Sequence, residues 1–338
     1  MAIRNVEMDF EYMNVIAGPP RGVSDMYSQA CSNDKVTCDT WRKPWVEQAR
    51  ANHKTYGPFK DRGVGQLFGK YAQRPIIIAG SGPSLKNNIH LLKNPKGVPV
   101  LSVLHNFHYM VDHEVPVDYF VSLDAGAITL PEISEGGSRT EEEYWELTKN
   151  HKLICFIGTH PELLKKWKGE IYFFTCPVPD EGIMSEFEKI EPFYTYVSTG
   201  GCVLGAATYI AKAIFGCNPI AFVGADFSFS YTKKFHPWKS KYDDNVGEAL
   251  RTVDVYGNRV LTWQSYFNFK TWFDWLSCTV AGIYINCSEG GTLGAYPEGN
   301  ILQIQQMPLE RFLWMYSMYQ EIRAQCENPS MKDMKILF

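Results

Sequence analysis

The sequence contains no apolar run long enough to span a membrane. Its start also lacks the basic end and apolar block of a secretory signal, because Glu7, Asp9 and Glu11 fall within the first twelve residues. A strong charge of one sign is absent too, since the formal net charge is −4 and the pI is near 6.1. We therefore expect a cytoplasmic protein whose attraction to anionic partners, if any, comes from local clusters.

Cysteine motifs for metal binding are also absent. The nine cysteines form no CxxC pair, and Cys31 and Cys38 have no second Cys/His pair at a spacing that suits zinc. Cys155, Cys202 and Cys217 lie in apolar segments, which is typical of small buried residues. The sequence therefore predicts reduced thiols and no zinc site.

Two common nucleotide motifs are missing. No GxxxxGK[ST] occurs, which excludes a P-loop. The stretch Gly80-Ser-Gly-Pro-Ser-Leu85 follows an apolar run, but Leu85 replaces the third glycine of GxGxxG. His105-Asn106 stands where a ribose-binding acid would follow the next strand, so a dinucleotide site is not supported. Either an ordinary strand-to-helix turn or a nucleotide phosphate site of another type remains.

Short apolar runs alternate with helical or polar stretches from residue 75 onward. This alternation predicts an α/β fold with a Rossmann-like, mostly parallel sheet and helices on both faces. The predicted strands are Ile76–Ala79, Val98–Leu104, Tyr119–Leu123, Leu153–Ile157, Ile171–Phe174 and Ile220–Val223.

Three regions are expected along the chain. Residues 1–74 form an N-terminal extension, partly helical at Thr40 to His53 and locally basic between Arg42 and Arg74. Residues 75–305 form the nucleotide-binding domain, which includes a small hairpin at Asp254 to Thr262. Residues 306–338 contain a C-terminal amphipathic helix.

Polar and glycine residues follow several predicted strands, where ligands bind in parallel sheets. Gly80–Ser84 follows the first, Asp124 the third and Asp226 the sixth. Ser198-Thr-Gly-Gly201 precedes an apolar helix, Val203 to Phe215, which Ser198 or Thr199 can cap. Two glycine-rich helix starts therefore flank one sheet.

These motifs carry a resemblance to a known family. Gly80–Leu85, Val117–Asp124, Ser198–Gly201, Pro219–Asp226 and Asn286–Gly291 resemble the 6-hydroxymethylpterin pyrophosphokinase MptE-like family over about residues 75 to 305. Part of the pattern is also similar to bacterial CMP-sugar sialyltransferases and to Maf glycosyltransferases. The resemblance supports the fold and a nucleotide pocket, whereas the related families transfer either a diphosphate or a sugar.

The resemblance implies a set of nucleotide-binding residues. Gly80, Ser81, Gly82, Pro83 and Ser84 would line the phosphate side, and Asn106, Ser198, Thr199, Gly200 and Gly201 would contact base, ribose or phosphate. Asp124 and Asp226 would face the pocket from strand ends. A metal-binding, ribose-binding or helix-capping role stays open for both aspartates.

His236 is the candidate for proton transfer, with Asp226 as a second catalytic residue. An imidazole can take a hydroxyl proton at neutral pH, and a His on a comparable loop is the base in the sialyltransferases that the chain resembles. Lys233, Lys234, Lys239 and Lys241 would neutralise a leaving phosphate or hold an anionic acceptor, with Trp238 as a stacking surface.

We therefore expect a transferase that uses a nucleotide-activated donor, with glycosyl transfer from a nucleotide sugar as first choice. The aromatic residues Trp238, Tyr242, Trp263 and Tyr266 favour it, because rings stack on sugar or base. ATP-dependent diphosphate transfer to a hydroxymethyl group is the alternative, and it would place a divalent metal on Asp124 or Asp226. A catalytically inactive nucleotide-binding module is the third hypothesis.

The acceptor is the least specified partner. Between Arg42 and Arg74 there are eight Lys or Arg residues against two acids, Glu47 and Asp61. Together with the lysines around His236, this excess makes an anionic acceptor such as hydroxymethylated DNA one candidate.

Overall fold

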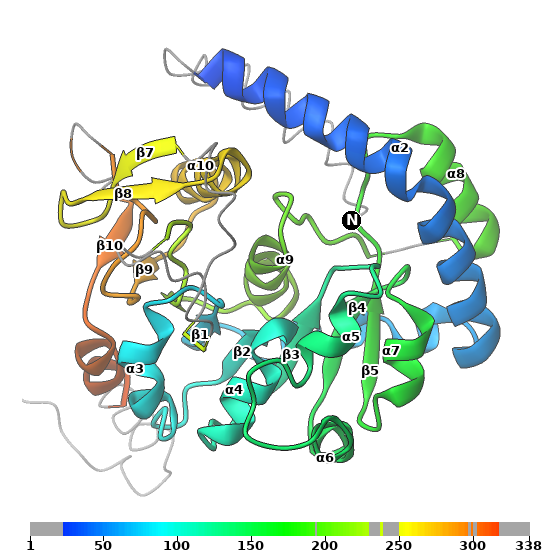
Figure 1. The fold of residues 1–338 in the computed structure, drawn as a ribbon, viewed down its shortest axis with the longest axis horizontal. Coiled ribbons are helices and arrows are strands. Elements are labelled where there is room, and N and C mark those ends of the chain that lie inside the picture. Colours follow the sequence, from blue (N-terminus) through cyan, green and yellow to red (C-terminus); the bar gives the residue numbers. More distant parts are fainter. Residues whose placement is uncertain are drawn as a thin grey trace, which may run out of the picture.

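The structure is a computed structural model. It describes residues 23–192, 195–229, 237–238, 250–296, 299 and 303–317, with side chains from residue 35 onward. Most of the described chain surrounds one parallel sheet (Figure 1).

The sheet has eight strands, and each of them pairs in parallel with its neighbours. They are β1 (Ile76–Ala79), β2 (Val100–Val103), β3 (Tyr119–Ser122), β4 (Leu153–Phe156), β5 (Ile171–Phe174), β6 (Ile220–Val223), β9 (Tyr284–Asn286) and β10 (Ile304–Gln306). All four residues of β1, β2, β3, β4 and β6 are buried, as expected for strands covered on both faces. The predicted α/β fold with a mostly parallel sheet is confirmed.

The strand order is β10-β9-β6-β1-β2-β3-β4-β5, which places β1 in the interior of the sheet. From β1 the chain builds outward to β5, then returns to place β6 on the other side of β1. The direction of winding therefore reverses between β1 and β6. Such a switch point leaves a crevice at the carboxyl ends of the two strands, where ligands bind in α/β proteins.

Helices connect and cover the strands. They are α2 (Val23–Tyr56), α3 (Leu85–Leu92), α4 (Phe107–Asp112), α5 (Thr129–Glu132), α6 (Glu141–Leu147), α7 (Pro161–Lys166), α8 (Glu181–Ile190), α9 (Val203–Tyr209) and α10 (Gln264–Thr279). The helix α9 packs across β1, β2 and β3 and continues into a π-helical turn, Ile210–Ile214. Its predicted end at Phe215 is close to the observed one, and the next residue, Gly216, has a φ of +75°.

The chain before residue 75 packs into the same core as the sheet. Val46 and Ala49 of α2 are buried, and so are Phe59 and Val64 in the short helical turns that follow and Tyr71 beyond them. The backbone of this segment also bonds to the end of the π-helical turn, with Gly69 N–H donating to Ile214 O at 2.7 Å. No break in packing therefore coincides with residue 75, although the extension is helical as predicted.

The β7 and β8 strands (Leu250–Val253 and Arg259–Thr262) pair in antiparallel fashion beside α10, so the predicted hairpin forms (Figure 1). Residues 309–317 are helical and bury Leu309 and Phe312, in agreement with the predicted C-terminal helix. Among the described residues, none of the helices is both long and apolar enough to cross a membrane.

Candidate functional site

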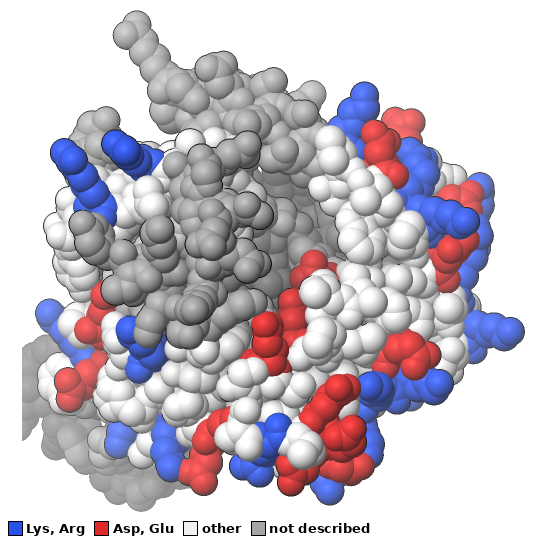
Figure 2. Space-filling model, viewed as in Figure 1, with Lys and Arg blue, Asp and Glu red and all other residues white. Residues whose placement is uncertain are grey.

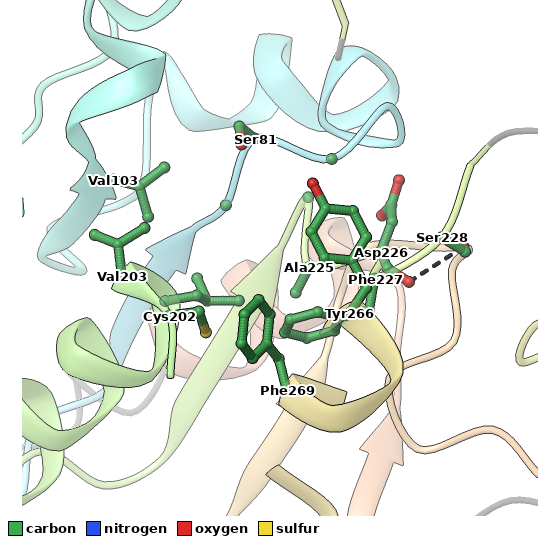
Figure 3. Close-up of a pocket in the computed structure, with 14 residues that line it drawn as sticks. Ser81, Val103, Cys202, Val203, Ala225, Asp226, Phe227, Ser228, Tyr266 and Phe269 are labelled. Carbon is green, nitrogen blue, oxygen red and sulfur yellow. Dashed lines mark hydrogen bonds between the residues drawn. The ribbon is translucent and has the colours of Figure 1, made fainter. Parts of the chain in front are cut away.

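A pocket of about 160 Å³ opens at the switch point between β1 and β6. Its walls come from the turn after β1, the end of β2, the turn after β6, the start of α9 and the aromatic side of α10 (Figure 3). Its lining residues are Gly80, Ser81, Gly82, Val103, Cys202, Val203, Leu204, Gly224, Ala225, Asp226, Phe227, Ser228, Tyr266 and Phe269. The topology, rather than any single motif, thus brings five segments of the described chain to one place.

The turn after β1 packs backbone to backbone against the turn after β6. Gly80 N–H donates to Val223 O and Gly82 N–H donates to Gly224 O, both at 2.8 Å. A Cβ on Gly80 or Gly82 would lie 2.6 Å from Gly224 O, so only glycine permits this contact. These amides are engaged within the protein. Phosphate binding by Gly80–Ser84, including Pro83, therefore stays a prediction, and Ser81 is the polar side chain that the turn presents to the pocket.

Asp226 joins the two turns through its carboxylate. One oxygen accepts a 2.7 Å hydrogen bond from Ser84 N–H, and the other accepts the Ser84 hydroxyl proton. The side chain thereby sits at the start of α3, where the N–H groups and the positive end of the helix dipole favour an anion. These are the contacts expected for the predicted helix-capping role of Asp226. The residue also lines the pocket.

The environment of Asp226 works against its ionisation. The residue is only 4% exposed, and this burial raises the pKa of its carboxyl from 3.8 to about 6 against the two hydrogen bonds from Ser84. Its main-chain oxygen accepts from Thr292 N–H at 2.7 Å, which ties in the segment after β9. A buried carboxylate retained in a pocket against its desolvation cost is a candidate functional residue.

Asn106 lies behind the turn rather than on the pocket surface. Its side chain is fully buried, and its amide donates to Gly80 O at 2.9 Å and to Ser102 Oγ at 3.3 Å. Its carbonyl oxygen has no hydrogen-bond partner. Asn106 therefore stabilises the turn after β1 from behind. Its binding to base, ribose or phosphate stays a prediction.

Asp124 follows β3 and is not part of the pocket lining. Its surface is accessible to solvent, yet protein surrounds it closely enough that desolvation raises the pKa of its carboxyl. Among the described residues, no three His, Cys, Asp or Glu side chains converge as metal ligands.

The Ser198–Gly201 turn packs on α10. Gly200 and Gly201 have φ of +54° and +82°, and a Cβ on Gly200 would come within 2.3 Å of the Trp272 ring. A Cβ on Gly201 would lie 2.9 Å from Phe269. The two glycines therefore admit aromatic rings of the protein itself, and the ligand contacts predicted for Ser198, Thr199 and these glycines stay predictions.

The start of α9 differs from the expectation in one respect. Its cap is Cys202, whose sulfur accepts from Gly205 N–H at 3.4 Å, whereas Thr199 Oγ1 accepts from Gly201 N–H at 3.2 Å. Burial raises the pKa of the Cys202 thiol to about 12, so it is protonated at neutral pH. Cys202 therefore contributes an uncharged wall to the pocket.

The α10 wall is the part of the site that sequence reasoning only partly found. Phe269, Trp272 and Phe273 suggest core by their helical spacing, but Phe269 lines the pocket together with Tyr266. Figure 3 shows both side chains projecting from α10 beside Phe227 and across from Ser81. The available signal was the three-residue spacing of Tyr266 and Phe269, which places them on one helix face.

Several predicted site residues lie outside the described residues. They are His236, Lys233, Lys234 and Lys239, together with Lys241 and Tyr242. Trp238 is described, and it packs on side chains that follow β2. The proton transfer predicted for His236 and the acceptor or phosphate contacts predicted for these lysines therefore stay predictions.

Several of the basic residues before residue 75 have partners within the protein, and two of them pair with α8. Arg42 pairs with Asp180 and Arg50 pairs with Glu186, both at α8. Figure 2 shows blue and red side chains interleaved along this side of the molecule. These two arginines therefore dock α2 on α8, and the local excess available to an anionic acceptor is smaller than the sequence indicates.

The comparisons with known proteins agree with this architecture. No curated protein matches the sequence. A solved structure of a Maf glycosyltransferase from Magnetospirillum magneticum AMB-1 matches with a TM-score of 0.55 and 15% identity, covering 83% of this chain and 42% of that one. This chain thus spans less than half the length of that relative, and at this identity the likeness shows the fold.

The family comparison extends over more than half of the chain. The model of the 6-hydroxymethylpterin diphosphokinase MptE-like family matches residues 51–232, which include β1 through β6 and the turns on both sides of the pocket. The match begins before residue 75, in agreement with the packing of that segment. The chain belongs to the 6-hydroxymethylpterin diphosphokinase MptE-like family.

Proposed function

We propose that this protein is a nucleotide-dependent transferase that moves a sugar from a nucleotide-sugar donor to an acceptor hydroxyl. The observation that carries the proposal is the pocket at the β1/β6 switch point, which has an aromatic wall and little charge. Tyr266 and Phe269 offer rings on which a base can stack, a contact worth about 1–3 kcal/mol per base. The polar turns opposite, with Ser81 and Ser228, suit ribose and phosphate.

Charge favours a sugar donor over ATP. The described lining contains no Lys or Arg, and its one ionisable carboxyl is Asp226. A triphosphate brings several negative charges that such a wall does not compensate, whereas a sugar nucleotide carries fewer. The glycosyltransferase name of the solved neighbour supports the same choice, while the diphosphokinase name of the family supports the alternative.

The proposed reaction uses one base and one leaving group. His236 takes the proton of the acceptor hydroxyl, and that oxygen forms a bond to the anomeric carbon of the donor sugar. The bond from this carbon to the nucleotide phosphate breaks, and the nucleotide leaves with its electron pair into the pocket. Asp226 contributes by holding Ser84, and with it the turn after β1, in place.

Diphosphate transfer to a hydroxymethyl group is the second candidate, and it would call for a divalent metal. Both oxygens of Asp226 already accept hydrogen bonds from Ser84, and Asp124 does not line the pocket. The described residues thus do not form a preassembled metal site at the pocket, and we derive no step through a metal. Turnover of ATP that stops on chelation and resumes with Mg²⁺ would select this candidate instead.

The test measures nucleotide release from several donors, and it compares the wild type with a His236→Ala variant. The protein is incubated with CMP-sugars, UDP-sugars and ATP, and the free nucleotide is quantified with and without acceptor candidates. We expect release from a nucleotide sugar, and we expect His236→Ala to lower the rate by at least 100-fold. His90→Ala, an exposed histidine on α3, is the matched control and should keep full activity.

Two outcomes contradict the proposal. Full turnover by the His236→Ala variant removes this residue as the base. Binding of a nucleotide without any change in donor or acceptor after prolonged incubation would instead support the third hypothesis, an inactive nucleotide-binding module.

A further inference from the structure

The helix α10 carries a buried ion pair in addition to the two rings that line the pocket. Lys270 Nζ lies 2.8 Å from Asp274 Oδ2, one helical turn further along, and both residues are buried. Because two charges lose their hydration in such a place, apolar side chains of similar size are often at least as stabilising. Stability alone therefore does not account for this pair, and its partners on other elements indicate what else it does.

The partner of the ion pair outside α10 is Tyr296, which follows β9 in the chain. Its hydroxyl donates to the same Asp274 oxygen at 2.6 Å, and Lys270 Nζ lies 3.5 Å from the centroid of its ring. The phenol is thus held by a hydrogen bond to a charged acceptor and by a cation–π contact, both of which strengthen where water is excluded. We call Lys270, Asp274 and Tyr296 the Lys270 cluster.

Residues 291–296, which we call the linking segment, connect the Lys270 cluster to the other side of the pocket. Thr292 N–H donates to Asp226 O at 2.7 Å, and Thr292 Oγ1 donates to the same oxygen at 3.1 Å. A Cβ on Gly291 would lie 2.4 Å from Asp226 Cα, so the two backbones are in direct contact. Ala295 N–H donates to Thr292 O at 2.9 Å, which keeps the segment compact. Only four positions separate Thr292, at Asp226, from Tyr296, at α10.

The linking segment is also fixed to the sheet and to the hairpin. Leu293 O accepts from Asn286 Nδ2 at 3.3 Å and from Gln306 Nε2 at 3.1 Å, which are side chains of β9 and β10. Gly291 O accepts from Val255 N–H at 3.0 Å, in the turn between β7 and β8. The segment therefore gives the Lys270 cluster a fixed attachment point.

The Lys270 cluster lies on the helix that carries the aromatic wall of the pocket. Phe269 precedes Lys270 directly, and Tyr266 precedes it by about one helical turn. Both rings and Asp226 line the same pocket (Figure 3). Because α10 is continuous over these positions, a shift at Lys270 carries both rings with it. The attachment at Tyr296 thus fixes the rings relative to the turn after β6.

We propose that the Lys270 cluster positions α10, and that it thereby sets the width of the slot in which the base of the donor stacks. Its three members are positioning residues, because none of them belongs to the described lining of the pocket and they act through Tyr266 and Phe269. The consequence for donor binding rests on the proposed function, whereas the placement of α10 does not.

Hydrogen–deuterium exchange tests the placement of α10 without any ligand. Tyr296→Phe removes the hydroxyl that bonds to Asp274 and keeps the ring. We expect peptides from α10 to exchange at least five-fold faster in this variant, with peptides from β1 and β6 unchanged, because the change opens one element locally. The matched control is Tyr256→Phe, which removes a hydroxyl from a ring that is 65% exposed and should exchange like the wild type. Unchanged exchange of α10, or equal acceleration of all peptides, overturns the proposal.

A triple variant separates positioning from stability. Lys270→Met, Asp274→Leu and Tyr296→Phe together replace the Lys270 cluster by apolar side chains and leave no member of it charged or unpaired, a change that is often neutral or stabilising. We expect its urea midpoint to equal or exceed that of the wild type. Its affinity for a nucleotide, measured by equilibrium dialysis with CMP, UMP and AMP as probes, should nevertheless fall at least five-fold.

The affinities then decide the role in the slot. A triple variant that keeps both the stability and the nucleotide Kd of the wild type overturns it. If the triple variant loses stability, the Kd of Tyr296→Phe decides instead, and a rise of at least two-fold is expected. If the wild type binds none of the three nucleotides, the proposed function fails while the exchange experiment still decides the placement of α10, so the two failures are distinguishable.

Discussion

At the scale of single residues, Asp226 illustrates how stability and function can oppose each other. Its carboxylate is buried, accepts two hydrogen bonds from Ser84, and still has its pKa raised to about 6. Desolvation therefore outweighs the hydrogen bonds. An asparagine could keep both contacts, accepting from Ser84 N–H with its oxygen and donating to the hydroxyl with its nitrogen. Because a neutral asparagine would satisfy the fold at this position, we infer that the pocket requires the negative charge of Asp226.

This opposition predicts a specific pH dependence for Asp226→Asn. The unfolded carboxyl loses its proton near pH 3.9 and the folded one near pH 6, so between these values the folded state binds more protons. Wild-type stability therefore falls as the pH rises from about 4 to about 6 and is level above that. The free energy of unfolding of Asp226→Asn relative to wild type should rise by about 2 kcal/mol over this range.

Urea unfolding between pH 4 and pH 8 measures this difference. Asp61→Asn, at an exposed acid, is the matched control and should show no such trend. A constant difference between Asp226→Asn and wild type would show that the carboxyl is not desolvated as described. If the carboxylate also serves turnover, the variant should gain stability at pH 8 and lose activity.

Single residues also mark how far the sequence could predict this molecule. The β-branched run of β1 and the apolar run of β6 are predicted with their exact bounds, because strands covered on both faces must be continuously apolar. Cys202 was missed as the cap of α9, since a thiol is not a typical capping group. Phe269 was assigned to the core, because helical spacing cannot distinguish a ring that packs on protein from one that lines a pocket.

At the scale of elements, the pocket depends on how closely α10 approaches the start of α9. The contact is made possible by Gly200, which combines a φ of +54° with a Cβ position 2.3 Å from the Trp272 ring. The sequence predicted that a ligand would come close to this glycine, but periodicity alone could not say that a helix of the same chain does so. Gly200 and Trp272 are 72 positions apart in the sequence, and such a long-range contact is set by the tertiary structure.

Gly200→Ala should therefore destabilise the protein for two reasons. The positive φ costs roughly 1–2 kcal/mol for alanine, and the clash with Trp272 adds roughly 1–3 kcal/mol of overpacking. Gly257→Ala is the matched control, since Gly257 has a φ of +82° and no atom within 4 Å of its Cβ position. Urea unfolding should show the larger loss for Gly200→Ala.

The double variant Gly200→Ala with Trp272→Ala separates the two contributions. Removing the ring should recover the overpacking part but not the backbone part. Equal losses for Gly200→Ala and Gly257→Ala would mean that α10 yields to the added methyl group, and the pocket wall would then be less rigid than described.

At the scale of the whole molecule, the described side chains between residues 35 and 74 pack into the same core as the sheet. Isolated apolar residues of this segment, among them Phe59, Val64 and Tyr71, enter the core without the spacing of a strand or a long amphipathic helix. Sequence patterns detect periodicity and therefore place such a segment outside the domain. The same reasoning misses β10, a strand of three residues of which two are exposed glutamines.

This organisation predicts the outcome of two truncations. A chain that begins at residue 75 loses Phe59, Val64 and Tyr71 from the core, and it leaves Ile214 O without its donor at Gly69. Deleting a buried Phe alone typically costs 3–5 kcal/mol, and a whole domain has only about 5–15 kcal/mol of stability. We therefore expect the chain starting at residue 75 to lack a cooperative unfolding transition by calorimetry and circular dichroism.

A chain starting at residue 23 keeps these contacts and should melt cooperatively. Cooperative melting of the shorter chain at a similar temperature would show that residues 1–74 are an extension after all, and that the arginine pairs with α8 merely dock it.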